Sequence, residues 1–154
     1  MTLAVQAADL DASRIDGTRV YLLELLKRFG SLAPETDFHL YHKHRFNPEL
    51  TPPLFPNYTV HTLPFPSQWM QTRFARAMFR TQPEKIFFPV QAVPVFLPSA
   101  SEVTITVHDL AWKHYPETFT PKTRFKLNFL LERAVQRANK IVAVSEATKK
   151  DLLH

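Results

Sequence analysis

Residues 103–146 read VTITVHDLAWKHYPETFTPKTRFKLNFLLERAVQRANKIVAVSE, and this stretch decides the fold. Val103–Val107 is a continuous β-rich run of the kind found in interior parallel strands. Thr120 followed by Pro121 is a strong start for a long helix. The apolar side of that helix is expected to consist of Phe125, Leu127, Leu130, Leu131, Ala134, Val135 and Ala138. Ile141–Val144 is the next predicted strand.

The rest of the chain continues this alternation. Leu3–Ala8 is a predicted buried strand, Asp9–Gly17 a loop, and Thr18–Phe29 an amphipathic helix that Gly30 is expected to end. The other predicted elements are strands at Asp37–Tyr41, Tyr58–Leu63 and Lys85–Val90, a helix at Gln68–Arg80, and a last helix that begins at Glu146 with Ser145 as its cap. Alternating strands and helices predict an α/β sandwich with a mostly parallel sheet, in one domain.

Composition narrows the classes of function. The formal charge of +5, from 19 Lys and Arg against 14 Asp and Glu, favours an anionic partner such as a lipid surface, a phosphorylated acceptor or nucleic acid. The absence of cysteine excludes disulfides and thiolate metal sites, and two glycines are too few for a glycine-rich phosphate cradle. The start of the chain lacks the pattern of a secretory signal, so a cytoplasmic location is expected.

Four segments carry a resemblance to a known family. They are Asp11–Arg14 with Gly17–Tyr21, Phe87–Pro89 with Pro94 and Pro98, Thr104–Leu110 with Tyr115–Glu117, and Ile141–Thr148 with Lys150–Leu152. In this order and at this spacing they resemble the N-terminal domain of glycosyltransferases of family 4, in the glycosyl transferase group 1. These enzymes have the GT-B architecture of two Rossmann-like domains.

The resemblance implies a Rossmann-like three-layer sandwich over residues 1–154, which forms the N-terminal, acceptor-side half of a GT-B enzyme. It implies a retaining enzyme that moves a hexose from a nucleotide-diphosphate sugar to a glycan or lipid-linked acceptor, with no obligatory metal ion or other cofactor. The family's nucleotide-sugar site, with its paired glutamates, lies in a C-terminal domain without a counterpart in these residues. We therefore expect a truncated chain that is catalytically inactive by itself.

His108 and Asp109 are the predicted catalytic residues. They directly follow a predicted strand, and ligands of open α/β sheets bind beyond the carboxyl ends of the strands. By resemblance His108 lies near the transferred sugar, where an imidazole can hydrogen-bond a hydroxyl and titrate near neutral pH. Asp109 is expected to orient His108, to accept from an acceptor hydroxyl, or to cap the next turn. The structural alternative is a buried pair that ties the loop to the strand.

Two helix starts are predicted to contact the donor. Gly17 and Thr18 open the first helix, whose amides and positive dipole end suit a phosphate or carboxylate, although Gly17 alternatively relaxes a tight loop. Arg19 stands where many members have a second glycine, which is unfavourable for close backbone approach to a phosphate. The second group is Ser145, Glu146 and Thr148, which also fit the roles of a helix cap and first-turn residues.

The helix at Gln68–Arg80 suggests a membrane contact. One of its faces combines an aromatic residue with arginines: Trp69, Arg73, Arg76 and Arg80. A basic amphipathic helix can lie on anionic lipid, so peripheral contact with the inner face of the membrane is an expectation. The alternative is a core-packing helix whose arginine face is solvated.

Neither a metal site nor a nucleic-acid site is predicted. A strand would place His42 and His44 on one face and His39 on the other, which argues against a shared metal ion. No RNA- or DNA-reading motif accompanies the basic charge. The rival function is a free-standing binding or regulatory module, a split or degenerate glycosyltransferase domain that pairs with another chain. A homodimer that covers the open interdomain surface is a further expectation.

Overall fold

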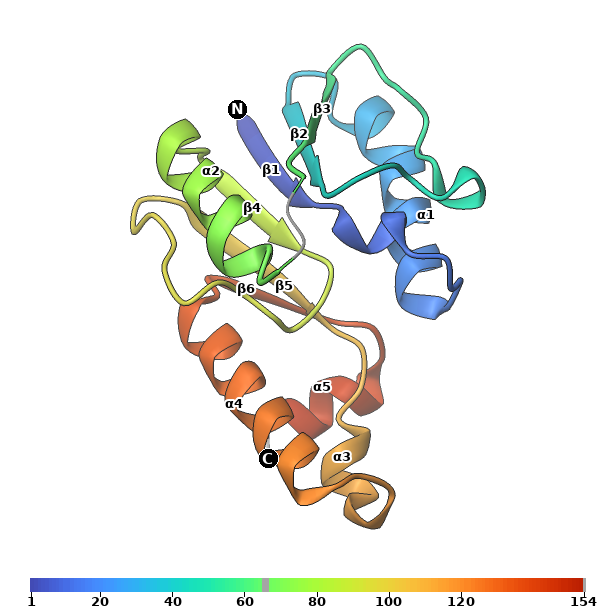
Figure 1. Ribbon diagram of the computed structural model, residues 1–154, viewed down its shortest axis with the longest axis vertical. Helices are drawn as coiled ribbons and strands as arrows, with labels where there is room; N and C mark the ends of the chain where they lie inside the picture. Colours follow the sequence, from blue (N-terminus) through green and yellow to red (C-terminus); the bar gives the residue numbers. More distant parts are fainter. Residues whose placement is uncertain (65–66, 154) are drawn as a thin grey trace. The chain divides into compact units, whose positions relative to one another are not determined.

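The computed structural model describes residues 1–64 and 67–153 and shows an α/β fold of Rossmann-like type (Figure 1). Within the described residues, six strands form a sheet in the order β3-β2-β1-β4-β5-β6. Helical segments separate consecutive strands along the chain, except between β4 and β5. Every pair whose register is resolved is parallel, which confirms the predicted fold class. The chain divides into two compact units, Met1–Phe87 with Pro94–Glu102 (unit 1) and Phe88–Val93 with the residues from Val103 onward (unit 2).

Unit 1 contains the first strands of the sheet and two helical layers. Its strands are β1 (Thr2–Gln6), β2 (Asp37–His42), β3 (Tyr58–Thr62) and β4 (Lys85–Phe88, whose last residue is counted with unit 2). Its helices are α1 (Gly17–Leu32) and α2 (Ala75–Thr81), with the short helical turns η1 (Ala8–Asp11), η2 (Pro48–Leu50) and η3 (Met70–Phe74).

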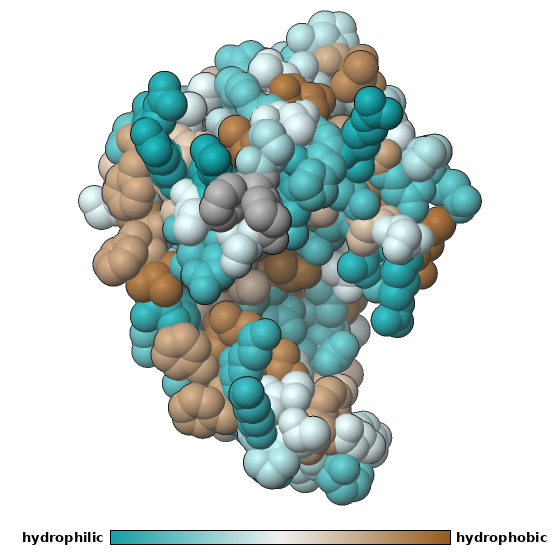
Figure 2. Space-filling model, in the orientation of Figure 1, coloured by the Kyte–Doolittle hydropathy of each residue, from teal (hydrophilic) through white to brown (hydrophobic). Residues whose placement is uncertain are grey.

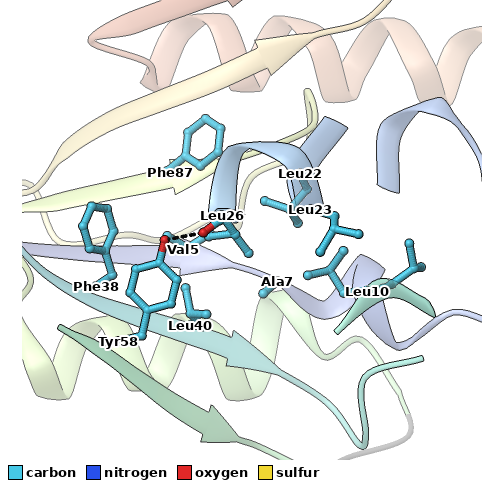
Figure 3. Packing of buried hydrophobic residues seen from close by; sticks show 11 residues of the cluster. Val5, Ala7, Leu10, Leu22, Leu23, Leu26, Phe38, Leu40, Tyr58 and Phe87 are labelled. Atoms are coloured by element: carbon cyan, nitrogen blue, oxygen red, sulfur yellow. Dashed lines mark hydrogen bonds between the residues drawn. The ribbon is translucent and has the colours of Figure 1, made fainter. Parts of the chain in front are cut away.

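The core of unit 1 lies between α1 and the strands. Leu22 and Leu26 of α1 are fully buried against Val5 of β1 and Leu40 of β2, as Figure 3 shows. The next residue of β2, Tyr41, packs perpendicular to Phe74 with ring centroids 5.6 Å apart. Because successive strand residues point to opposite faces, η3 and α2 cover the face opposite α1. Unit 1 is therefore a three-layer arrangement.

Gly30 does not end the first helix, so this part of the sequence interpretation was wrong. Helix α1 continues to Leu32, and Gly30 has no positive φ angle. A Cβ atom at Gly30 would lie 2.3 Å from Cγ of Phe55, far inside van der Waals contact. The glycine is thus required for the close approach of the Phe55 side chain and not for a left-handed helix end.

The last turns of α1 are held by Asn57, which directly precedes β3, and by Tyr58, the first residue of β3. The Tyr58 hydroxyl donates to the carbonyl of Leu26 at 2.7 Å (Figure 3). It also accepts from the amide of Gly30 at 3.0 Å. The hydroxyl therefore contacts the Gly30 amide and the Leu26 carbonyl, which are four residues apart, the spacing of hydrogen-bonded groups in an α-helix. Asn57 Nδ2 donates to the carbonyls of Gly30, Ala33 and Thr36. Carbonyls near the helix end thus find side-chain partners.

We expect Tyr58→Phe to lower the free energy of unfolding by about 1–2 kcal/mol, because two buried backbone groups lose their shared partner.

Burial raises the pKa of Tyr58 to about 12, above the ordinary value of 10.0. A raised pKa contributes stability below pH 10 that is lost as the pH rises toward 12. Urea unfolding followed at pH 8 and pH 11 should show a smaller pH-dependent loss in Tyr58→Phe than in the wild type. Tyr115→Phe is the control, since Tyr115 is 60% exposed; equal losses in all three proteins would contradict the assignment.

The second predicted helix begins with a wider turn than expected. Gln68–Arg80 was predicted as one α-helix, whereas η3 is a π-helix that leads into α2. The amide of Phe74 donates to the carbonyl of Trp69, five residues earlier, at 3.0 Å. Both rings are buried, with centroids 5.4 Å apart. A π-turn allows residues five apart to face the same core, which explains the departure from α-helical geometry.

Unit 2 contains the strand–helix–strand pattern that the sequence predicts. Its elements are β5 (Glu102–Val107, whose first residue is counted with unit 1), α3 (Ala111–His114), the turn η4 (Pro116–Thr118), α4 (Pro121–Arg137), β6 (Lys140–Ala143) and α5 (Glu146–Leu153). Strands β5 and β6 pair in parallel register. Thr120 caps α4 by accepting from the amide of Thr123 at 3.2 Å, with Pro121 in the first turn. These predictions are confirmed.

The apolar side of α4 is narrower than predicted. Leu131 and Ala134 are buried, but Phe125 is 76% exposed and Val135 is 38% exposed. At about 100° per residue, Phe125 and Leu131 lie about 120° apart around the helix. The apolar side predicted from the sequence is therefore buried only in part, because periodicity alone does not fix where the buried arc of a helix ends.

Candidate active site

The loop after β1 leads into the first predicted donor site. Asp16 caps α1, since its carboxylate accepts from the amide of Arg19 at 3.3 Å and also from the Arg19 guanidinium. Gly17 is exposed, and a Cβ added there would meet nothing within 4 Å. Thr18 and Arg19 are half-buried. The carboxylate of Asp16 therefore already occupies the positive end of the α1 dipole. The space beside Gly17 at this helix end is unfilled by neighbouring atoms.

Asp9 is a candidate that the sequence reasoning missed. Burial raises the pKa of the Asp9 carboxyl, while the positive charges of Arg19 and Lys43 oppose that rise. Gln6 donates a side-chain hydrogen bond to Asp9, and the buried Gln6 Oε1 has no hydrogen-bond partner within the described part of the chain. Perturbed pKa values cluster at functional sites, and Asp9 lies in η1, shortly after β1. Its position after a buried strand was the available signal.

A buried polar network joins the ends of the first three strands. The Asp11 carboxylate accepts from Nδ1 of His42 at 2.9 Å and from the amides of Lys43 and His44 at 2.7 and 2.9 Å. His42 Nε2 lies 2.9 Å from the hydroxyl of Thr62. The side chains of Asp11 and His42 are 7% and 5% exposed. Because the carboxylate fixes the hydrogen on Nδ1, His42 Nε2 is the acceptor for the Thr62 hydroxyl when the ring is neutral.

His108 lies at the carboxyl end of β5 and is half-buried. Its Nε2 is 2.7 Å from the carbonyl oxygen of Pro89, which also belongs to unit 2. A carbonyl only accepts, so Nε2 carries the hydrogen and Nδ1 is the acceptor nitrogen of the neutral ring. The backbone carbonyl of His108 accepts from the hydroxyl of Thr148 at 3.1 Å. Both the ring and the backbone of His108 are therefore held in place.

Ser145 caps α5, as the sequence predicts. Its hydroxyl accepts from the amide of Thr148 at 3.1 Å and lies 3.0 Å from the Thr148 hydroxyl. Thr148 is buried, whereas Glu146 is exposed in the first turn of α5. A cavity of about 410 Å³ opens beside this turn; its lining comprises Val135, Ile141, Ala143, Ser145, Glu146, Lys149, Leu152 and Leu153.

Asp109 is exposed, and its carboxylate accepts from the amide of Ala111 at 3.0 Å. It therefore caps the turn that leads into α3, which was one of the roles considered for it. No hydrogen bond between Asp109 and the ring of His108 is present among the described interactions. The predicted residues thus fall into two groups. His108, Ser145 and Thr148 are connected within unit 2, and Gly17, Thr18 and Arg19 surround the cap of α1 in unit 1.

The predicted membrane face of the second helix is only partly exposed. Trp69 is 4% exposed, its Nε1 donates to the carbonyl of Leu63 at 2.7 Å, and Lys43 lies 5.8 Å from its ring centroid. The sequence interpretation that placed Trp69 beside the arginines on a lipid-facing surface was therefore wrong. Arg73, Arg76 and Arg80 are exposed.

Two of the three histidines considered for metal binding, His39 and His42, have separate side-chain partners. His39 Nδ1 lies 2.8 Å from Nε2 of His61, while His42 belongs to the network with Asp11. Burial, and then the neighbouring His39, lower the pKa of His61. Within residues 1–64 and 67–153, no group of three or more His, Cys, Asp or Glu side chains is arranged to hold a metal ion. In the same described ranges, every helix is too short or too polar to cross a bilayer.

Comparison with known proteins adds no assignment. No protein-family model matches the chain, and no curated protein matches its sequence.

Proposed function

We propose that this chain is the acceptor-side domain of a retaining glycosyltransferase that moves a hexose from a nucleotide-diphosphate sugar to a glycan or lipid-linked acceptor. The observation that carries the proposal is the position of His108, at the carboxyl end of a parallel strand with its ring held by Pro89 and its backbone by Thr148. Parallel α/β sheets bind ligands at that end of their strands. The four sequence segments support the same class of enzyme.

In this function the imidazole of His108, held by the carbonyl of Pro89, contacts a hydroxyl of the transferred sugar. A side chain fixed before the substrate arrives stabilises developing charge without having to reorganise during the reaction. Asp109 shapes the same loop through its cap on α3. We assign contact with the donor to Gly17, Thr18 and Arg19 in unit 1. We assign it likewise to Ser145, Glu146 and Thr148 in unit 2. The reaction would need no metal ion, and we place it in the cytoplasm.

The second candidate function is a binding or regulatory module. The observation that favours it is the exposed apolar lining of the cavity next to Ser145, where Val135 is 38% exposed, Ile141 41% and Leu153 76%. Exposed apolar patches of this kind mark surfaces that another chain covers. Either a partner domain or a second copy of the chain would meet this description.

A transfer assay with a panel of nucleotide-diphosphate sugars tests the proposal, using the complete gene product and the isolated 154-residue chain. We expect turnover by the former and none by the latter. His108→Asn in the active protein should lower kcat/KM by about 10²-fold, as expected when one preorganised hydrogen bond is lost. His44→Asn is the matched control, because the side chain of His44 is exposed.

Turnover by the isolated chain would overturn the proposed division between two domains. Wild-type activity of His108→Asn would overturn the role of His108. A complete gene product that turns over no donor but forms a stable complex with another protein would establish the binding module instead.

A further inference from the structure

Helix α4 displays two phenylalanines to solvent. Phe125 is 76% exposed and Phe129 is 49% exposed, and residues four apart lie on the same face of a helix. The buried residues of α4, Leu131 and Ala134, lie on another side. Within the described residues, the two rings therefore form an apolar stripe that the fold of the chain itself does not cover.

Basic side chains lie next to this stripe, along one side of it. Lys122 and Lys126 are exposed, and at about 100° per residue they lie within about 100° of Phe125 around the helix. The guanidinium of Arg133 lies 5.8 Å from the ring centroid of Phe129. Helix α4 carries five basic residues and a single acidic one, Glu132. In the part of Figure 2 where Figure 1 shows α4, hydrophobic and strongly hydrophilic side chains lie next to one another.

We propose that this face of α4, defined by Lys122, Phe125, Lys126 and Phe129, docks on an anionic lipid surface. A helix that lies in a membrane interface inserts aromatic side chains between the headgroups while its lysines remain beside the lipid phosphates. The long lysine stems allow the charge to stay in water as the rings are buried. The inference goes beyond the proposed sugar transfer and does not depend on it.

The pattern of charges favours lipid over a second copy of the chain. A twofold contact through this face would bring Lys122 and Lys126 of both copies into one interface, where like charges repel. A lipid surface with acidic headgroups has the complementary charge. The face also differs from the one predicted by sequence, whose aromatic anchor Trp69 is buried.

Co-sedimentation with vesicles tests this proposal without any nucleotide sugar, so its result is independent of the transfer assay. The vesicles contain either phosphatidylcholine alone or phosphatidylcholine with about one third phosphatidylserine. We expect binding to the anionic vesicles that weakens as salt is added. The double variant F125S/F129S should bind about tenfold more weakly or worse, and K122Q/K126Q should lose a similar factor through its charge.

Two matched variants serve as controls. Phe96→Ser removes a similarly exposed ring, 73% accessible, from residues 86–101, a stretch without Lys or Arg, and should bind like the wild type. R76Q/R80Q removes charges from α2 and should retain most of the binding. Fluorescence of Trp112, which is buried and hydrogen-bonded to Asn128 of α4, verifies that the α4 variants are folded.

The proposal is overturned if the wild type fails to bind anionic vesicles, if F125S/F129S binds as tightly as the wild type, or if only R76Q/R80Q loses binding. It is also overturned if sedimentation velocity without lipid shows a dimer that F125S/F129S abolishes, since the stripe would then be a protein interface. Tighter binding to a single-stranded oligonucleotide than to the vesicles would equally reject a lipid partner.

Discussion

Asp11→Ala is expected to lower the free energy of unfolding of unit 1 by about 3 kcal/mol. The Asp11 carboxylate accepts three hydrogen bonds, from His42 Nδ1 and from the amides of Lys43 and His44. Each buried donor that loses its acceptor costs about 1–3 kcal/mol of stability. The expected total for the three donors stays at about 3 kcal/mol, because water that enters the space left by the carboxylate can accept some of these hydrogen bonds. The effect should be large because this one side chain connects the loop after β1 to the end of β2.

Urea denaturation followed by tryptophan fluorescence measures this change. The chain has two tryptophans, Trp69 in unit 1 and Trp112 in unit 2, so a Trp112→Phe background reports on unit 1 alone. Asp37→Ala is the control, because Asp37 is exposed and surface substitutions usually change stability by less than about 0.5 kcal/mol. If Asp11→Ala is no less stable than Asp37→Ala, the network does not contribute to stability as the geometry indicates.

Gly30→Ala is expected to destabilise the protein by about 1–3 kcal/mol, although alanine favours helices. The new Cβ would lie 2.3 Å from Cγ and 2.6 Å from Cβ of Phe55, so the side chain and its backbone would both have to move. Inserting a methyl group into a packed core usually costs this much. The gain in helix propensity, about 1 kcal/mol at most, is too small to offset the clash.

The second glycine of the chain provides the control. Gly17 is also in α1, but a Cβ there would meet nothing within 4 Å, and neither glycine has a positive φ angle. Gly17→Ala should therefore leave stability unchanged or raise it by up to about 1 kcal/mol. Thermal unfolding of both variants should show opposite changes in Tm. A Gly30→Ala protein as stable as Gly17→Ala would mean that Phe55 moves away without cost.

For much of the candidate site, the sequence predicted where each residue lies along the chain but not which residues it contacts. That His108 follows a strand could be predicted, because a β-rich run ends at Val107. Its hydrogen bond to Pro89 could not be predicted, since the two residues are 19 positions apart and periodicity does not report such contacts. The raised pKa of Asp9 could not be predicted either, because its cause, the burial of the carboxyl group, arises only in the folded arrangement.

The sequence by itself determined the α/β alternation, the parallel character of the sheet and the caps of the later helices. Thr120 and Ser145 were predictable because a cap bonds an amide only three residues away. Tertiary structure alone decided that Gly30 admits Phe55, that Trp69 is buried and that Phe125 faces solvent. These outcomes depend on neighbours distant in sequence, and periodicity shows that a residue is apolar without showing what covers it.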